Sequence, residues 1–164
     1  MLKRLCKFLK LQKDIVNLTI FHYKKTGKWI NLRNPKTFGE KIQWLKIYDK
    51  NPLKTILSDK AAVREYVAEK GFSHILNEAY GVYGSPDDID IDALPESFVL
   101  KANHGSGWNI ICKDKSDFNW EEAKEKLRGW LNKKYANSRT LEWQYDGIKP
   151  AVLCEKYLDG ENGN

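Results

Sequence analysis

The chain has 164 residues, of which 41% are hydrophobic, 30% charged and 12% aromatic, and this composition excludes a disordered chain. No apolar run approaches the roughly 20 residues that cross a bilayer, and the first residues lack the uncharged core of a secretory signal. Three dispersed cysteines without a C-x-x-C pair exclude a disulfide framework. We therefore expect a cytoplasmic protein with a packed core.

The net charge of +6 is concentrated at the N-terminus. Residues 1–36 hold ten Lys or Arg against one acid, whereas residues 37–164 hold eighteen against twenty-one. Leu2, Leu5 and Leu9 recur at helical spacing between basic residues. Residues 1–36 are thus expected to form a basic helical extension with a short amphipathic helix within residues 1–13. That helix either contacts an anionic membrane or partner surface weakly or packs its leucines on its own domain, and no docking motif for nucleic acid is present.

Residues 37–96 are predicted to be a helical leading region with one short strand. Thr37 and Glu40 match a capping box, and the helix that they open is expected to end near residue 51. A second helix is expected to begin at residue 58 or 59 and to end at Gly71. A short strand is predicted at residues 79–84, and the acidic stretch at residues 85–96 is predicted to be a surface loop.

Residues 97–164 are predicted to form a small antiparallel sheet with a helix packed on it. The strand at residues 97–103 carries Lys101, a glycine loop follows, and residues 108–113 form a second strand, which together make a hairpin. Asn119 is predicted to cap a helix with Glu122, and residues 151–158 form a final buried strand. The predicted fold class is therefore α+β, with N-terminal helices leading into the sheet.

The glycine loop suits phosphate binding. Glycines let backbone N–H groups approach an anion closely, and the strand lysine adds a positive charge beside them. The Walker pattern is absent, and a Rossmann pattern would need a third glycine where Ile110 stands. Strand, glycine loop and strand in this order are typical of kinases and ATP-grasp enzymes. The alternative is an ordinary hairpin turn.

Two longer strings are more specific. The sequences PKTFGEKIQWLK, at residues 35–46, and FVLKANHGSG, at residues 98–107, resemble the signatures of the TupA-like ATP-grasp family. The resemblance covers roughly residues 34–158. Members of this family occur in bacterial gene clusters for cell-surface polysaccharide and teichuronopeptide synthesis, and some carry a glycosyltransferase label.

The resemblance implies a set of ATP-binding residues. Lys60 and Lys101 would contact the phosphates, with a surface helix position for Lys60 and an edge-strand position for Lys101 as alternatives. The phosphate loop would consist of His104, Gly105, Ser106, Gly107, Trp108 and Asn109. The adenine hinge would consist of Glu155, Lys156, Tyr157 and Leu158. Glu155 would accept a hydrogen bond from the exocyclic amine, unless it is an ordinary carboxylate at a strand end.

The resemblance also implies an activity. ATP-grasp enzymes hold Mg²⁺ with acidic residues and an Asn well downstream of the hinge, so these ligands are expected outside residues 1–164 and the chain is expected to be the front portion of a longer, truncated ATP-grasp fold. The implied reaction is ligation, in which a carboxylate attacks the γ-phosphate of ATP and a nucleophile such as an amine displaces phosphate from the acylphosphate. The alternatives are a non-catalytic nucleotide-binding or scaffold protein of a polysaccharide cluster, and a glycosyltransferase. No catalytic residue or metal ligand is assigned from the sequence.

Overall fold

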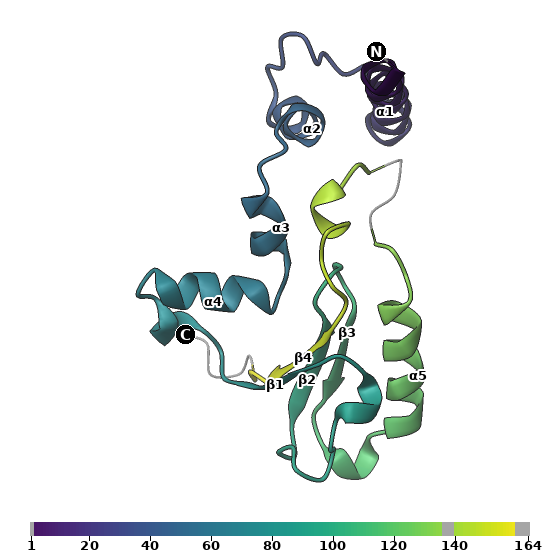
Figure 1. The fold of residues 1–164 in the computed structure, drawn as a ribbon. Helices are drawn as coiled ribbons and strands as arrows, with labels where there is room; N and C mark the ends of the chain where they lie inside the picture. Colours follow the sequence, from purple (N-terminus) through teal and green to yellow (C-terminus); the bar gives the residue numbers. More distant parts are fainter. Residues whose placement is uncertain (1, 136–139, 160–164) are drawn as a thin grey trace.

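The computed structural model describes residues 2–135 and 140–159, and its helical half leads into a half built from a sheet and one α-helix (Figure 1). The helical half contains α1 (Leu2–Thr26), α2 (Phe38–Tyr48), α3 (Leu53–Ser58) and α4 (Ala62–Glu69). The other half contains β1 (Ala79–Tyr83), β2 (Phe98–Ala102), β3 (Asn109–Cys112), α5 (Trp120–Leu131) and β4 (Val152–Lys156). The fold class is α+β, as predicted.

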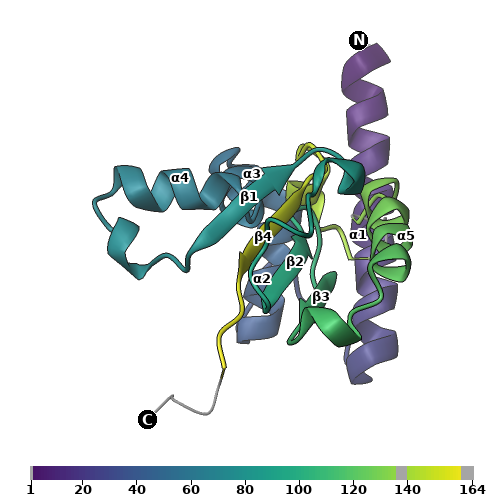
Figure 2. The same ribbon diagram turned by 90° about the horizontal axis from the view of Figure 1, so that it is seen from below.

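The strands of the described residues form one antiparallel sheet in the order β1-β4-β2-β3. The last of the described strands, β4, therefore lies between β1 and β2. The predicted hairpin of β2 and β3 is confirmed, with Lys101 directly opposite Asn109. Helices α4 and α5 lie on opposite sides of the sheet (Figures 1 and 2). One face of the sheet therefore packs against α5 to form the core, and the opposite face does not belong to that core.

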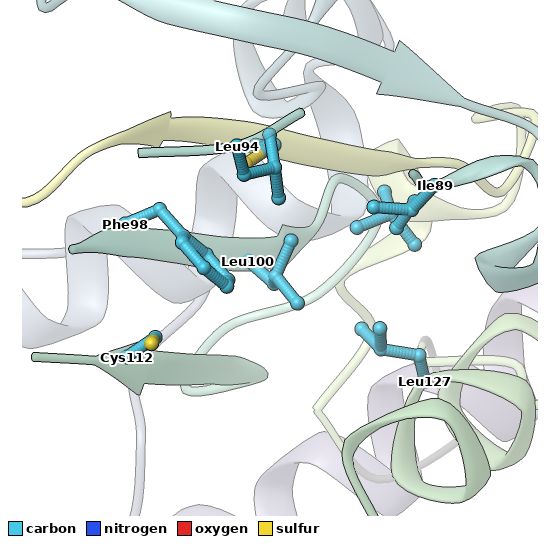
Figure 3. Close-up of a cluster of buried hydrophobic side chains, with 8 residues drawn as sticks. Ile89, Leu94, Phe98, Leu100, Cys112 and Leu127 are labelled. Atoms are coloured by element: carbon cyan, nitrogen blue, oxygen red, sulfur yellow. The ribbon is translucent and has the colours of Figure 1, made fainter. Parts of the chain in front are cut away.

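The core forms between α5 and the sheet face that it covers. Phe98 and Leu100 of β2 are fully buried there together with Leu127 of α5 (Figure 3). Alternation along a strand sends every second side chain to this face, and each buried side chain of this size contributes roughly 1.5–3 kcal/mol of stability. The core thus fixes which side chains of β2 and β4 point to the opposite face.

The prediction of a surface loop at residues 85–96 is wrong in part. Ile89 and Leu94 are only 5% and 7% exposed and belong to the core cluster, as Figure 3 shows. The aspartates between them face solvent, so the acidic composition hid two apolar side chains that turn inward. A polar average over a segment therefore does not exclude core residues within it.

The N-terminal helix is longer than predicted. The expected short helix within residues 1–13 continues to Thr26, and Gly27 ends it with φ +70°. Leu18 explains the extension, because its side chain is 1% exposed and packs the second half of the helix on the rest of the chain. No helix within the described ranges is long and apolar enough to cross a membrane.

The predicted helix caps and the glycine helix end agree with the structure better than the predicted surface loop and N-terminal helix length do. The capping box of Thr37 and Glu40 is confirmed at the start of α2, and Asn119 caps α5 by accepting from the backbone N–H of Glu122 at 3.1 Å. Gly71 ends the second predicted helix with φ +83°. That helix begins later than predicted, at Ala62, because the separate short helix α3 occupies residues 53–58.

Candidate nucleotide-binding site

The sheet face opposite α5 carries Lys101 and Glu155. Lys101 pairs with Leu153 across β2 and β4, and Val99 pairs with Glu155, so the two charged side chains are diagonal neighbours on one face. They form an ion pair between Lys101 Nζ and Glu155 Oε1. The Glu155 side chain is 10% exposed and that of Lys101 30%. Lys101 lies on an interior strand, which excludes the alternative of an edge-strand lysine.

Two more cations, Lys60 and Arg64, approach this pair from the start of α4. Arg64 Nη1 lies 3.8 Å from Glu155 Oε2, and Arg64 also donates to the carbonyl of Asn77. Lys60 Nζ donates to the carbonyl of Ala102 at 2.9 Å and to that of Gly105. Burial, followed by the charge of Lys101, lowers the pKa of Lys60. The site therefore concentrates positive charge in a partly dehydrated place, where an added anion is favoured.

Asn103 joins three segments beneath this cluster, and the sequence analysis missed its role. Its side chain is almost fully buried, and Nδ2 donates to Asp59 Oδ1 and to the carbonyl of Lys149, both at 3.0 Å. Its Oδ1 accepts from the backbone N–H of Ala151 at 2.8 Å. Because Lys60 follows Asp59, these bonds hold the lysine against the hairpin. A residue type that is depleted in strands, standing at the end of a buried strand, was the available signal.

The glycine loop has an anchored stem and an exposed tip. His104 is 3% exposed, and its Nε2 lies 3.1 Å from the carbonyl oxygen of Trp130. A Cβ on Gly105 would stand 2.7 Å from the Trp108 ring, so only glycine allows this packing. Ser106 and Gly107 form the exposed tip, and Gly107 has φ +76°. The structure thus places His104 and Trp108 toward α5 and leaves the tip open.

The open face also carries exposed polar and apolar side chains beside the ion pair. Asn109 is exposed directly opposite Lys101. Val82 of β1 and Ile111 of β3 lie on the same face, because they pair with Leu153 and Val99, and both are about half exposed. This face is a wall with apolar and cationic parts. A cavity of about 250 Å³ lies elsewhere, between α2, α3 and Trp143.

A comparison of the sequence with the profiles of known protein families identifies the family of this chain. The profile of the TupA-like ATPgrasp family matches residues 40–164, about three quarters of the chain and all the predicted site residues. The chain belongs to the TupA-like ATP-grasp family. Neither curated proteins nor solved structures gave a match. ATP-grasp proteins generally bind ATP and Mg²⁺, which gives the cationic sheet face of this family member a specific anion to be tested.

The predicted hinge of this ATP-grasp chain comprises the last two residues of β4, Glu155 and Lys156, and the two residues that follow the strand. The backbone N–H of Lys156 donates to the carbonyl of Glu78 at 2.9 Å, and its carbonyl accepts from Asn77 Nδ2 at 2.8 Å. The ammonium of Lys113 lies 5.8 Å from the ring centre of Tyr157, and Leu158 is 67% exposed. A carbonyl oxygen has a second lone pair, so the segment retains hydrogen-bonding capacity for a ligand.

Magnesium does not fit the described part of this ATP-grasp chain. Among residues 2–135 and 140–159, no three His, Cys, Asp or Glu side chains come together in a group that could hold a metal ion. The carboxylate nearest the candidate phosphate site, Glu155, is already paired with Lys101 and Arg64.

Proposed function

We propose that this chain binds ATP across the open face of its sheet and serves an ATP-dependent carboxylate ligase of bacterial cell-surface polysaccharide synthesis. The observation that carries the proposal is the cluster of Lys60, Arg64 and Lys101 around Glu155, beside an exposed glycine tip. Membership of the TupA-like ATP-grasp family supports ATP as the anion. The ligase reaction and the polysaccharide context follow from the resemblance of the sequence to that family.

The phosphates are proposed to bind where Lys101 now pairs with Glu155. A triphosphate carries more charge than a carboxylate, so it competes for the Lys101 ammonium. Lys60 uses two of its three N–H donors on the carbonyls of Ala102 and Gly105, which leaves the third for phosphate. The N–H groups of Ser106 and Gly107 would close over the phosphates from the loop tip.

The base is proposed to bind at the other end of the ion pair. Once Lys101 turns to the phosphates, Glu155 stays held by Arg64 and can accept from the exocyclic amine of adenine. The segment of Lys156, Tyr157 and Leu158 lies beside the base, and Val82 and Ile111 offer apolar contact to the nucleoside.

The reaction that this binding would serve conserves atoms in two steps. A carboxylate oxygen of the substrate attacks the γ-phosphorus, the bond to the β-phosphate oxygen breaks, and ADP leaves with an acylphosphate formed. A nucleophile such as an amine then attacks the carbonyl carbon, the bond to the phosphate oxygen breaks, inorganic phosphate leaves, and the amine nitrogen gives up a proton to solvent or to the released phosphate. The residues described here bind and orient ATP for this chemistry, and none of them is assigned to the reacting atoms.

Isothermal titration of the full chain with ATP and, separately, with UDP-glucose tests the nucleotide. Binding of ATP without binding of UDP-glucose is expected. Preference for UDP-glucose would replace the ligase by a glycosyltransferase, and binding of neither would contradict the proposal.

Hydrogen exchange locates the site. The amides of Ser106 and Gly107 should exchange more slowly with ATP present, whereas the buried stem at His104 should be slow in both states. Protection confined to surfaces away from the loop and β2 would show that ATP binds elsewhere. With ATP, Mg²⁺ and a candidate carboxylate present, hydroxylamine traps any acylphosphate as its hydroxamate. Because no metal-binding group lies among the described residues, little hydroxamate is expected from this chain, and robust hydroxamate formation would show that the reacting residues lie within it.

A further inference from the structure

The outward side of α1 carries a row of exposed apolar side chains, which is interrupted at Gln12. Its members lie three, four or seven residues apart and therefore share one side of the helix. This outer stripe consists of Leu2, Leu5, Leu9, Val16, Ile20 and Tyr23, each at least 42% exposed. Figure 2 shows the N-terminal part of α1 projecting away from the rest of the chain. The family profile begins at residue 40, so this helix lies outside the matched region.

The opposite side of α1 is the one that packs on the protein. Leu18 is 1% exposed, and Leu11 and Ile15 are partly buried. At 3.6 residues per turn, Leu18 points away from Val16 and Ile20 by more than a right angle. The inner side of α1 therefore packs on the rest of the protein, and the outer stripe is a separate apolar surface that is exposed.

The charge of α1 indicates whether the outer stripe contacts a second copy of the helix or a lipid surface. The helix contains seven Lys or Arg and a single acid, Asp14. Lys10, Lys13 and Lys24 are exposed and border one side of the stripe. Two copies of α1 packed stripe to stripe would bring two strongly positive helices together, which is unfavourable. An anionic lipid surface instead offers negative headgroups to the lysines and an apolar boundary to the stripe.

Aromatic side chains at the end of the stripe fit the same surface. Tyr23 stacks on Trp29 with ring centres 4.4 Å apart, and Trp29 is 68% exposed. Tyr and Trp concentrate at the headgroup level of membranes because they combine an apolar ring with a polar group. The stripe thus ends in the residue types that an interfacial helix uses as anchors.

We propose that α1 lies along an anionic phospholipid surface, with the outer stripe at the headgroup boundary and its lysines on the headgroups. The helix does not span the bilayer, since its basic residues exclude that arrangement. The site on the sheet is then held close to the membrane. The proposal does not rest on ATP binding, because its residues lie outside the nucleotide site.

Co-sedimentation of the full chain with vesicles tests this proposal. Vesicles of phosphatidylglycerol and phosphatidylcholine are expected to bind the protein at low salt and to release it as salt rises. Vesicles of phosphatidylcholine alone are expected to bind it much more weakly. Equal binding to both compositions, or no binding to anionic vesicles at low salt, would overturn the proposal.

Two sets of variants assign the binding to α1. Replacing Lys3, Lys10 and Lys13 by Gln should weaken partition about fivefold for each residue, hence about a hundredfold in total. The matched control replaces Lys70, Lys113 and Lys126, which removes the same charge elsewhere and should leave partition nearly unchanged. Equal losses in the two triple variants would show that net charge, not α1, binds the vesicles.

The stripe is tested with Leu9→Gln and Val16→Gln together. Both side chains are more than half exposed, so the fold should persist, and circular dichroism checks this. Partition should fall about tenfold or more, since each buried methylene contributes to membrane binding. Phe72→Gln with Ile75→Gln, two exposed apolar residues elsewhere, is the control. Sedimentation equilibrium examines the competing occupant, and a dimer that these stripe substitutions dissociate, without vesicle binding, would overturn the proposal.

Discussion

Leucine and lysine residues occur both on helix α1 and in the sheet, but their exposure differs between the two regions. The leucines of α1 are largely exposed along its outer stripe, whereas Leu100 of β2 is fully buried. Lys10, Lys13 and Lys24 of α1 are exposed, whereas Lys60 and Lys101 are partly buried with specific partners. Residues 37–164, which contain the candidate phosphate site, hold fewer basic than acidic residues. Burial beside a partner therefore identifies a phosphate site better than the density of charge along the chain.

The largest difference between the two regions should appear in thiol reactivity. Cys6 on α1 is exposed, whereas Cys112 and Cys154 are at most 1% exposed, and burial raises the pKa of Cys154 to about 12. Access to a buried strand requires opening that costs several kcal/mol, so the two sheet thiols should react at least about a thousandfold more slowly. Titration with dithionitrobenzoate should show one fast equivalent in the native chain and three in denaturant. Two fast equivalents in the native chain would contradict the buried sheet core.

Truncating an apolar side chain should also separate the regions. Phe98→Ala removes a fully buried ring that packs edge to face on Phe118, with the two ring centres 5.5 Å apart. The substitution should lower the free energy of unfolding by about 3–5 kcal/mol. Leu9→Ala, at an exposed position of α1, should change it by less than about 0.5 kcal/mol. Urea unfolding measures both. Similar losses in the two variants would mean that the outer stripe packs on the protein.

Nucleotide affinity should respond to the loss of Lys101 on the sheet face but not to the loss of a lysine on α5. Lys101→Ala should weaken ATP binding by about 1.5–3 kcal/mol, roughly 10- to 150-fold, because a charge-assisted contact is lost. Lys126→Ala on α5 is the control, since that residue pairs with Glu122 on the other side of the sheet.

A double variant distinguishes a direct contact between Lys101 and phosphate from simple neutralisation of the Glu155 charge by Lys101. If Lys101 only neutralises Glu155, then adding Glu155→Gln to Lys101→Ala should restore ATP binding. If Lys101 contacts phosphate, the double variant should stay weak, because glutamine keeps an acceptor for adenine but supplies no charge. Restored binding would remove Lys101 from the phosphate site.

The smallest predicted effect compares two glycines. Gly105→Ala forces a Cβ to within 2.7 Å of the Trp108 ring and should lower the free energy of unfolding by about 1–3 kcal/mol. Gly129→Ala, inside α5 with no atom within 4 Å of the new Cβ, should raise it by up to about 1 kcal/mol through helix propensity. Thermal unfolding gives both signs. A stabilising Gly105→Ala would show that the loop stem tolerates a side chain.

The sequence by itself determined the features that depend on neighbours along the chain. Helix caps at Thr37 and Asn119, the helix end at Gly71 and the hairpin around the glycine loop all follow from bonds or turns within a few residues. The family signature was legible for the same reason, because it consists of contiguous strings. Local chemistry of this kind does not depend on the rest of the fold.

Tertiary structure alone decided which distant residues meet. Lys101 and Glu155 are 54 residues apart, and they pair because β4 enters the sheet beside β2 in one register. Asn103 reaches Asp59 across 44 residues, which brings Lys60 to the site. A shift of one residue in the pairing of β4 would turn Glu155 into the core and Cys154 toward Lys101. Register and packing, which arise only when the whole core forms, therefore created the candidate site from residues that the sequence could only name.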